Sequence, residues 1–364
     1  MNKFFISISM ALLMMLCIPE LVAAQQPVRL AVAGISHGHS SWIYNRKVKG
    51  DIEIVGIYET NKELVESFKK QYNLPSSLFY TNLEQMLETV KPQGVMAFGP
   101  VNEHIDVVRA SAPRKIHVMV EKPLATTYQD AFEIEKLAKN NQIKVLTNFE
   151  TSWYASNQYV RNLYKKGELG DLRKVMVNDG HGGPSQMDKH FISWLADPVK
   201  NGGGAITDFG CYGANLMTWL MDGQRPLSVT AVTAQNRPDL YPHVDDEATI
   251  ILQYPGVQCV IQASWSWTFS RKDMEVFGTK GYAVAVDRTQ VRTRLNRNEP
   301  EKVFQLDPLP APFEDPFAVF AQVIQGKLSG ESVALYELPV NIIAVEILDA
   351  ARQAASTGQT IKLK

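Results

Sequence analysis

The 364-residue sequence predicts an α/β protein whose first half is a doubly wound parallel sheet of the Rossmann type. Two observations predict this fold. Short apolar segments of strand length alternate with segments of helical periodicity over the first half of the chain. In addition, Gly34 ends the first strand and Glu59 closes the second, about 25 residues after the turn and near the usual ~20 of dinucleotide-binding units.

The first 24 residues predict a separate segment. Lys3 gives a positive start, the stretch from Phe4 to Ile18 is apolar, and Val22-Ala23-Ala24 offers small residues for cleavage. This pattern is typical of a secretory signal peptide that is cleaved near Ala24, with an uncleaved anchor as the alternative. We therefore expect export to the periplasm or cell exterior, and no membrane contact after cleavage.

Composition narrows the range of partners. The formal net charge is −1, which gives no indication of a nucleic-acid partner. Hydrophobic residues make up 45% of the chain, enough for sizeable cores in two domains. Cys211 and Cys259 are the cysteines that remain after the signal peptide, and they could pair or stay free.

The elements of the first half follow one another as βαβ units. Expected strands cover residues 28–34, 52–58, 94–98, 118–120 and 143–146. Expected helices are one after Gly34, one that begins with a capping box of Thr60 and Glu63, and three at residues 82–90, 105–110 and 128–140.

The fourth of these strands leads into Glu121-Lys122-Pro123. Pro123 ends the strand, because proline has no amide hydrogen for a central ladder. Glu121 and Lys122 then lie at the carboxyl end of a strand, where open α/β sheets bind ligands. A lysine there could hold a substrate oxygen or share its proton, and a surface ion pair is the alternative.

The turn after the first strand, Gly34 to His39, is irregular. Only the first of the three fingerprint glycines is present, and Ser36 and His39 occupy the other two positions. Backbone amides at a helix start could still hold a pyrophosphate, helped by the serine hydroxyl or a histidine such as His37. Glu59 would accept hydrogen bonds from the ribose hydroxyls and repel a 2′-phosphate, so NAD is expected rather than NADP.

Several motifs together resemble the Gfo/Idh/MocA family of sugar and polyol oxidoreductases. They are Glu121-Lys122-Pro123 with Leu124-Ala125, Gly99-Pro100 with His104, Asn148, the segment 202–212, and the tail 338–363. The resemblance implies a Rossmann domain over residues 26–148 and a C-terminal α/β domain over 149–364. The second domain would carry a large, mostly antiparallel sheet, often used for contacts in a homodimer or homotetramer. Its last helix is a candidate to pack back on the Rossmann domain.

The resemblance also implies site residues. The dinucleotide pattern already gives Gly34, Ser36, His37 and Glu59 for the cofactor, and the resemblance adds Gly99, Pro100, His104, Glu121, Lys122 and Asn148. Lys122, Asp208 and Tyr212 would bind substrate and carry catalysis, and Tyr212 replaces the family's usual histidine four residues after the aspartate. His181, in a glycine-rich loop, is a further candidate for substrate binding.

Alcohol oxidation requires an acceptor for the hydroxyl proton as well as for the hydride. A free tyrosine has a pKa of about 10, and a neighbouring ammonium would lower that pKa by favouring the phenolate. We therefore expect Lys122 and Tyr212 to form a proton relay, with Asp208 accepting a hydrogen bond from a second substrate hydroxyl. A core tyrosine is the alternative for Tyr212.

The second half is rich in strands, expected at residues 172–177, 227–234, 248–254, 257–264, 274–277 and 282–286, with helices at 212–221 and 341–355. Pro255-Gly256 predicts a hairpin, and Trp265 and Trp267 are expected on one face of a strand. The spacing of His37, His39, His181, His190 and His243 with Asp245 or Asp246 fits no ligand motif, so no metal is expected.

The leading hypothesis is an exported, NAD-dependent oxidoreductase that acts on a secondary hydroxyl of a sugar, polyol or glycoside. Free NAD is scarce outside the cytoplasm, so the cofactor would have to be retained and recycled. Retention suggests an alternative, a glycoside-cleaving enzyme that works by transient oxidation, elimination and re-reduction. A third hypothesis is a non-catalytic sugar or nucleotide binder, which Lys122, Asp208 and Tyr212 argue against.

Overall fold

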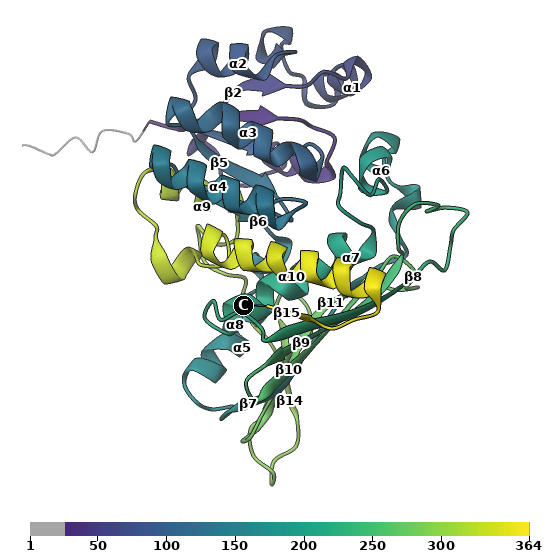
Figure 1. The fold of residues 1–364 in the computed structure, drawn as a ribbon. Helices are drawn as coiled ribbons and strands as arrows, with labels where there is room; N and C mark the ends of the chain where they lie inside the picture. The colour runs from purple at the N-terminus through teal and green to yellow at the C-terminus, as the bar shows by residue number, and fades with distance from the viewer. Residues whose placement is uncertain (1–25, 364) are drawn as a thin grey trace, which may run out of the picture.

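The computed structural model describes residues 26–363, so the predicted signal peptide lies outside the described residues. Two sheets dominate the fold, a six-stranded one built first along the chain and a nine-stranded one built second (Figure 1). Helix α10 (Leu338–Thr357) lies between them and contacts α4 and β6 on one side and α8 and β8 on the other.

The first sheet is parallel throughout and has the order β3-β2-β1-β4-β5-β6. This is the doubly wound order in which the direction of winding reverses between β1 and β4, the point at which such sheets bind dinucleotides. The predicted fold class is confirmed. The strands are β1 (Val28–Ala33), β2 (Ile52–Tyr58), β3 (Phe79–Tyr80), β4 (Gly94–Ala97), β5 (His117–Glu121) and β6 (Val145–Asn148).

The helices of this domain match the predicted ones closely: α1 (Lys62–Tyr72), α2 (Leu83–Val90), α3 (His104–Ser111) and α4 (Tyr128–Asn141). The predicted capping box is wrong by one residue, because the N-cap of α1 is Asn61, which accepts hydrogen bonds from Glu63 N and Leu64 N. The carboxylate of Glu59 binds the amides of Thr60 and Asn61, which holds Thr60 outside the helix.

The prediction of a helix after Gly34 is also wrong, because this segment forms only a six-residue 3₁₀ helix, η1 (Gly38–Ile43). Its polar side chains bond the local backbone instead. His37 Nδ1 accepts from His39 N, and the Ser41 hydroxyl donates to Gly38 O at 2.7 Å. Such bonds compete with helical ones and favour short turns.

The second sheet has the order β14-β13-β12-β11-β7-β10-β9-β8-β15, and its one parallel pair is β7–β10 among the described strands. The β9–β10 hairpin at Pro255-Gly256 is confirmed. The strands are β7 (Leu172–Gly180), β8 (Ser228–Ala234), β9 (Glu247–Tyr254), β10 (Val257–Ser264), β11 (Arg271–Gly278), β12 (Tyr282–Ala285), β13 (Gln290–Arg294), β14 (Lys302–Gln305) and β15 (Ile361–Lys362).

Besides α10, the second half contains α5 (Ala155–Lys165), α6 (Lys189–Leu195), α7 (Ala205–Asp208), α8 (Gly210–Leu220) and α9 (Pro316–Ile324). The placement of Trp265 on a strand is wrong, because β10 ends at Ser264. The Trp265 side chain instead turns inward and is fully buried.

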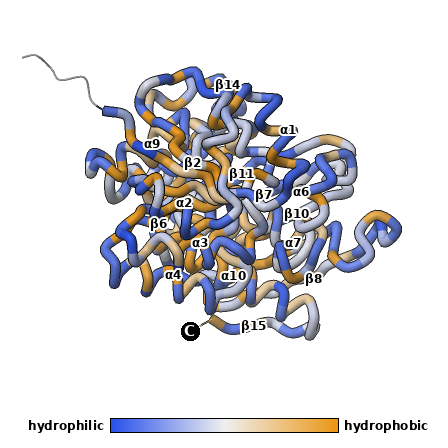
Figure 2. Tube along the Cα trace, turned by 90° about the horizontal axis from the view of Figure 1, so that it is seen from above, coloured by the Kyte–Doolittle hydropathy of each residue, from blue (hydrophilic) through white to orange (hydrophobic). Residues whose placement is uncertain are grey.

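Apolar residues concentrate along the inner strands, whereas many of the outer turns are hydrophilic (Figure 2). Cys211 and Cys259 are both buried and both free, so they do not form a disulfide with each other. No helix in the described part of the chain has the length and apolar character needed to span a membrane.

Candidate active site

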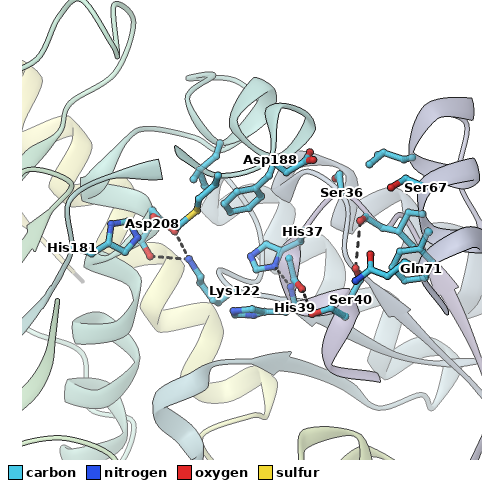
Figure 3. A pocket seen from close by; sticks show the side chains of 18 of the residues that line it. Ser36, His37, His39, Ser40, Ser67, Gln71, Lys122, His181, Asp188 and Asp208 are labelled. Carbon is cyan, nitrogen blue, oxygen red and sulfur yellow. Dashed lines mark hydrogen bonds and ion pairs between the residues drawn. The ribbon is translucent and has the colours of Figure 1, made fainter. Parts of the chain in front are cut away.

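A cavity of about 460 Å³ lies at the carboxyl ends of β1 and β5, between the two sheets (Figure 3). Residues of both halves of the chain line it. From the first half come Ser36, His37, His39 and Lys122, and from the second half come His181, Asp208, Phe209, Tyr212 and Lys272. The predicted catalytic residues Lys122, Asp208 and Tyr212 are therefore brought together, although 86 residues separate the first two.

Lys122 and Asp208 form a buried ion pair at the centre of this cavity. The Lys122 ammonium donates to Oδ1 of Asp208 and, at 3.1 Å, to the backbone carbonyl of the same residue. Burial alone would raise the pKa of Asp208, but the ammonium beside it holds that pKa below its usual value. For Lys122 burial alone would lower the pKa, and the carboxylate of Asp208 more than offsets this and raises it.

The second half of the chain holds Asp208 in place through Asp245. The Asp245 carboxylate accepts hydrogen bonds from Gly204 N at 2.9 Å and Ile206 N at 2.7 Å, at the start of α7. Gly204 is required there, because an added Cβ would collide with the Asp245 carbonyl oxygen. Asp246 likewise binds backbone amides, those of Asn236 and Arg237, so neither aspartate is placed as a metal ligand.

Tyr212 lies at the cavity with its ring beneath two ammonium groups. Lys122 Nζ is 5.2 Å and Lys272 Nζ is 4.8 Å from the ring centroid. The expected lowering of its pKa is wrong: burial, followed by the charge of Glu150, raises the pKa of Tyr212 well above the usual value. Lys122 faces the ring rather than the hydroxyl, and its charge is offset by Asp208.

Glu121 points away from Lys122 and anchors a second polar group. It is 1% exposed, and its Oε1 accepts a hydrogen bond of 2.6 Å from Asn148 Nδ2. Its Oε2 lies 3.1 Å from His39 Nδ1 and 3.9 Å from His37 Nε2. Glu121 and Asn148 therefore lie behind the histidines of the turn and do not line the cavity themselves.

His37, His39 and Glu121 form a cluster that sequence spacing did not predict. One ligand atom of each lies within 4.8 Å of the others, a geometry that could hold a metal ion. The remaining candidates do not join it: His190 is bonded to Asn61 on another side of the cleft, and His243 is exposed on a loop.

A second cavity adjoins the first and contains the predicted adenosine end of the cofactor site. It is lined by Gly34, Ser36, Glu59, Gly99 and Pro100, and it shares Ser36 and Leu64 with the first cavity. Gly34 has a φ of +77°, and a Cβ there would lie 2.8 Å from Gly99 N. The two cavities share lining residues and together reach from Glu59 to Lys122, an arrangement that fits an extended dinucleotide.

Two features of this path depart from expectation. Glu59 already accepts hydrogen bonds from the amides of Ile35, Thr60 and Asn61, so part of its capacity for ribose hydroxyls is used. His104 lines neither cavity. It is buried behind the strand end, with Nδ1 3.2 Å from Pro123 O and 3.3 Å from Leu124 O, and supports the Lys122 segment.

Residues 187–195, here called the α6 strap, cover the junction of the two cavities and were not predicted. Met187, Asp188, Phe191 and Leu195 line one cavity, while His190, Ser193 and Trp194 line the other. The strap is bonded to the Rossmann domain: Trp194 Nε1 donates to Ser36 Oγ at 3.0 Å, and His190 Nδ1 lies 3.1 Å from Asn61 Nδ2.

The second half of the chain adds three polar residues near the site that the sequence did not assign to it, Glu150, Asp179 and Lys272. Lys272 forms an ion pair with Glu150 at the wall of the site, and Asp179 lies opposite Lys272 across the β7–β11 pair. Asp179 is fully buried. Of the three, Lys272 lines the cavity, and the pairing register of β7 and β11 sets Asp179 beside it. His181 lines the cavity as predicted.

Comparison with known proteins matches each half of the chain to a known domain family. Residues 28–149 match the model of the oxidoreductase family with an NAD-binding Rossmann fold, and residues 157–284 match the GFO/IDH/MocA C-terminal domain. The chain is 25% identical over 267 residues to trans-1,2-dihydrobenzene-1,2-diol dehydrogenase of Bos taurus, covering 72% of this chain and 74% of that protein.

Solved structures share the whole fold. An inositol dehydrogenase homologue from Azotobacter vinelandii, complexed with NAD⁺, superposes with a TM-score of 0.81 at 18% identity, over 94% of this chain and 98% of that one. Aldose-aldose oxidoreductase from Caulobacter crescentus, complexed with glycerol, gives 0.77 at 20% identity, over 93% and 100%. Since both domain models match in order along one chain, the protein belongs to the Gfo/Idh/MocA family of NAD-binding oxidoreductases.

Proposed function

We propose that this chain is an exported enzyme that oxidises a secondary hydroxyl of a sugar, polyol or glycoside with a retained NAD. The observation that supports this most directly is the Lys122–Asp208 pair. It lies in a cavity that shares lining residues with the cavity beside Glu59, so a dinucleotide that spans both would end at a group that can hold a hydroxyl oxygen.

Bound NAD⁺ supplies the acceptor for the hydride of the substrate's C–H bond. The chain then has to bind the hydroxyl and remove its proton. Lys122 is placed to donate a hydrogen bond to the reacting oxygen, and Asp208 both fixes the ammonium and can accept from a neighbouring hydroxyl. His181 and Lys272 add donors on the far wall of the cavity, which suits a ligand with several hydroxyls.

Related structures support this class of substrate. The structures named above hold glycerol or NAD⁺, and the inositol dehydrogenase homologue has also been solved with NADH and myo-inositol. Each ligand other than the nucleotide is a polyol. The polar groups that line the cavity beside Lys122 fit a polyol, and the aromatic side chain of Phe209 adds an apolar wall for the C–H side of a ring.

The α6 strap supports retention of the cofactor. It lies over the junction of the two cavities, and its bonds to Ser36 and Asn61 must open if a dinucleotide is to leave between them. Retention would solve the scarcity of NAD outside the cytoplasm. It also keeps open a second candidate function, glycoside cleavage by transient oxidation, elimination and re-reduction, in which the cofactor ends each cycle in its starting state.

One experiment tests the proposal and separates these two functions. The mature protein is purified without added nucleotide and denatured, and the released nucleotide is identified by mass spectrometry. Near-stoichiometric NAD is the expected result. NADH growth with a free polyol then indicates net oxidation, whereas release of a nitrophenol from an aryl glycoside without net NADH indicates cleavage. Absence of both bound and added NAD would contradict both functions.

Assembly and location can be tested on the same protein. We expect a homodimer or homotetramer, because relatives of this architecture often associate through the large sheet. Light scattering on the purified mature chain measures the molecular mass. N-terminal sequencing of the protein from the host's extracytoplasmic fraction tests cleavage near Ala24.

A further inference from the structure

Three histidines line the cavity, His37, His39 and His181, and they differ in whether Nε2 of the ring can accept a proton. His37 Nδ1 accepts a hydrogen bond of 3.1 Å from His39 N, and His181 Nδ1 accepts one of 2.8 Å from Gly183 N. A neutral imidazole has one lone pair and one N–H. In both residues the lone pair is therefore used on Nδ1, and Nε2 carries the hydrogen and cannot take up a proton.

His39 has the opposite arrangement. Its Nδ1 lies 3.1 Å from Oε2 of Glu121, and an ionised carboxylate only accepts hydrogen bonds, so Nδ1 carries the hydrogen. The lone pair is then on Nε2. The hydrogen bonds of the described residues include none to this nitrogen, and the His39 ring lines the cavity that contains Lys122 (Figure 3).

The ring of His39 is held at one edge and on one face. At the edge, Nδ1 is bonded to Glu121, which is itself fixed by Asn148, whose Nδ2 donates to Oε1 at 2.6 Å. One face of the imidazole stacks on Trp42 with ring centroids 3.5 Å apart. A base oriented by a carboxylate, which is itself held by an amide, is the arrangement expected of a proton acceptor with one tautomer.

The position of His39 in the cavity also fits the role of a proton acceptor. Glu121 and Lys122 are consecutive at the end of β5, and their side chains lead to different partners, His39 and Asp208. His39 and Lys122 line the same cavity, so a ligand that fills it can contact both the ammonium, which would position a hydroxyl oxygen, and the imidazole, which can take the hydroxyl proton (Figure 3). Lys122 itself is protonated within its ion pair, and Tyr212 presents its ring to that ammonium.

We propose that His39 is the proton acceptor of the reaction and that Glu121 and Asn148 position it, an inference that rests on the proposed function. In the step, the substrate's C–H bond breaks with its two electrons leaving as hydride to NAD⁺, its O–H bond breaks, and a C=O bond forms. The hydroxyl proton forms a new N–H bond at His39 Nε2. The carboxylate of Glu121 stabilises the imidazolium, which returns the proton in the reverse direction or releases it to solvent.

The charged and titratable groups that surround His39 are His37, Glu121 and Lys122 from the Rossmann domain, and Glu150, Asp208 and Lys272 from the other half of the site. Burial, followed by the charge of Lys122, lowers the pKa of His39 well below 6.5. The imidazole is therefore neutral above that pKa, and the rate of oxidation should rise with pH to a plateau.

The first test does not depend on turnover. In protein with ¹⁵N-labelled histidine, long-range ¹⁵N–¹H spectra distinguish the two neutral tautomers for each of the 7 histidines of the sequence. The resonances that disappear in His39→Asn should belong to a ring with hydrogen on Nδ1. A ring with hydrogen on Nε2 would overturn the assignment. This result stands whether or not the proposed function is correct.

The second test uses kinetics. His39→Asn should lower kcat by about 10²–10⁴-fold and abolish the fall in rate at low pH, while NAD binding followed by fluorescence stays within about threefold of wild type. Glu121→Gln should retain partial activity and shift the low-pH limb, as expected of a positioning residue. His243→Asn, an exposed site, is the matched control. An unchanged kcat in a folded His39→Asn protein would overturn the proposal, with His39→Gln as a second variant if the first fails to fold.

A metal ion is the competing use of the same cluster. It would occupy Nδ1 of His39 and Nε2 of His37, so His39 could not donate to Glu121 and His37 would have to release the His39 amide. Metal analysis of the purified, dialysed protein should therefore give far less than one equivalent of zinc, manganese or iron. A stoichiometric metal that is lost in His37→Asn would overturn the assignment of His39 as the base.

Discussion

The indole of Trp265 donates a hydrogen bond of 2.8 Å to Oδ2 of Asp208, while Lys122 occupies Oδ1 of the same carboxylate. Both oxygens of Asp208 are thus bound by fixed donors in a site with little solvent. The arrangement identifies Asp208 chiefly as the group that fixes the ammonium of Lys122, and it limits how far the carboxylate can turn toward a ligand.

Removal of Lys122 should damage both stability and activity. Lys122→Ala leaves Asp208 as a buried charge without its partner, a change that typically costs about 3–5 kcal/mol of unfolding free energy. The activity should fall at least 10²-fold, because the donor to the substrate oxygen is lost as well. Urea denaturation and NADH formation measure the two effects, and Lys139→Ala, an exposed lysine of α4, is the control. Full turnover by Lys122→Ala would contradict the proposed function.

Loss of the Trp265 donor should have a smaller, separable effect. Trp265→Phe keeps most of the buried ring but removes the bond to a charged acceptor, worth about 1.5–3 kcal/mol. We expect a lower kcat with a nearly unchanged KM, since the carboxylate becomes free to turn and Lys122 is held less firmly. Trp267→Phe, two residues along the chain, is the matched control. Equal effects of both substitutions would indicate general loosening of the loop.

Much of the Rossmann domain could be predicted because its signals are local. The apolar strand segments, the helix at residues 82–90 and the proline after β5 are determined by neighbouring residues, and the structure confirms them. The prediction of a helix after Gly34 was wrong for a physical reason that hydrophobic periodicity does not reveal. His37 and Ser41 use their side chains on the backbone of the turn, which leaves only a 3₁₀ helix.

Only the site residues that belong to sequence motifs could be predicted. Lys122, Asp208 and Tyr212 belong to recognisable segments, and they meet in one cavity. Glu150, Asp179 and Lys272 lie in segments without such a signal, and the β7–β11 register alone sets Asp179 opposite Lys272. The tautomer of His39 depends on Glu121, 82 residues away, so it could be assigned only from three-dimensional geometry.

The α6 strap should control the residence time of NAD. Trp194→Ala removes the hydrogen bond to Ser36 and a buried indole at the junction of the cavities, so we expect NAD to dissociate about 10-fold faster. The nucleotide content of the protein as purified should fall in parallel. Stopped-flow displacement of NADH measures the rate, and Phe269→Ala, whose side chain is 81% exposed, serves as the control. Equal rates for wild type and Trp194→Ala would show that the strap does not retain the cofactor.

Asp179 should destabilise the fold at neutral pH. It is fully buried, and neither carboxyl oxygen has a hydrogen-bond partner among the described residues, so burial raises its pKa well above the usual value. A carboxyl with a raised folded-state pKa costs nothing below its unfolded pKa of about 3.9, and the cost grows as pH rises toward the folded value. Asp179→Asn should therefore stabilise the protein at pH 7, with the gain shrinking toward pH 4. Urea denaturation at several pH values measures this gain. Asp171→Asn, an exposed aspartate before β7, should give no gain at any pH. A gain of the same size at pH 4 and pH 7 would mean that ionisation of Asp179 is not the cause.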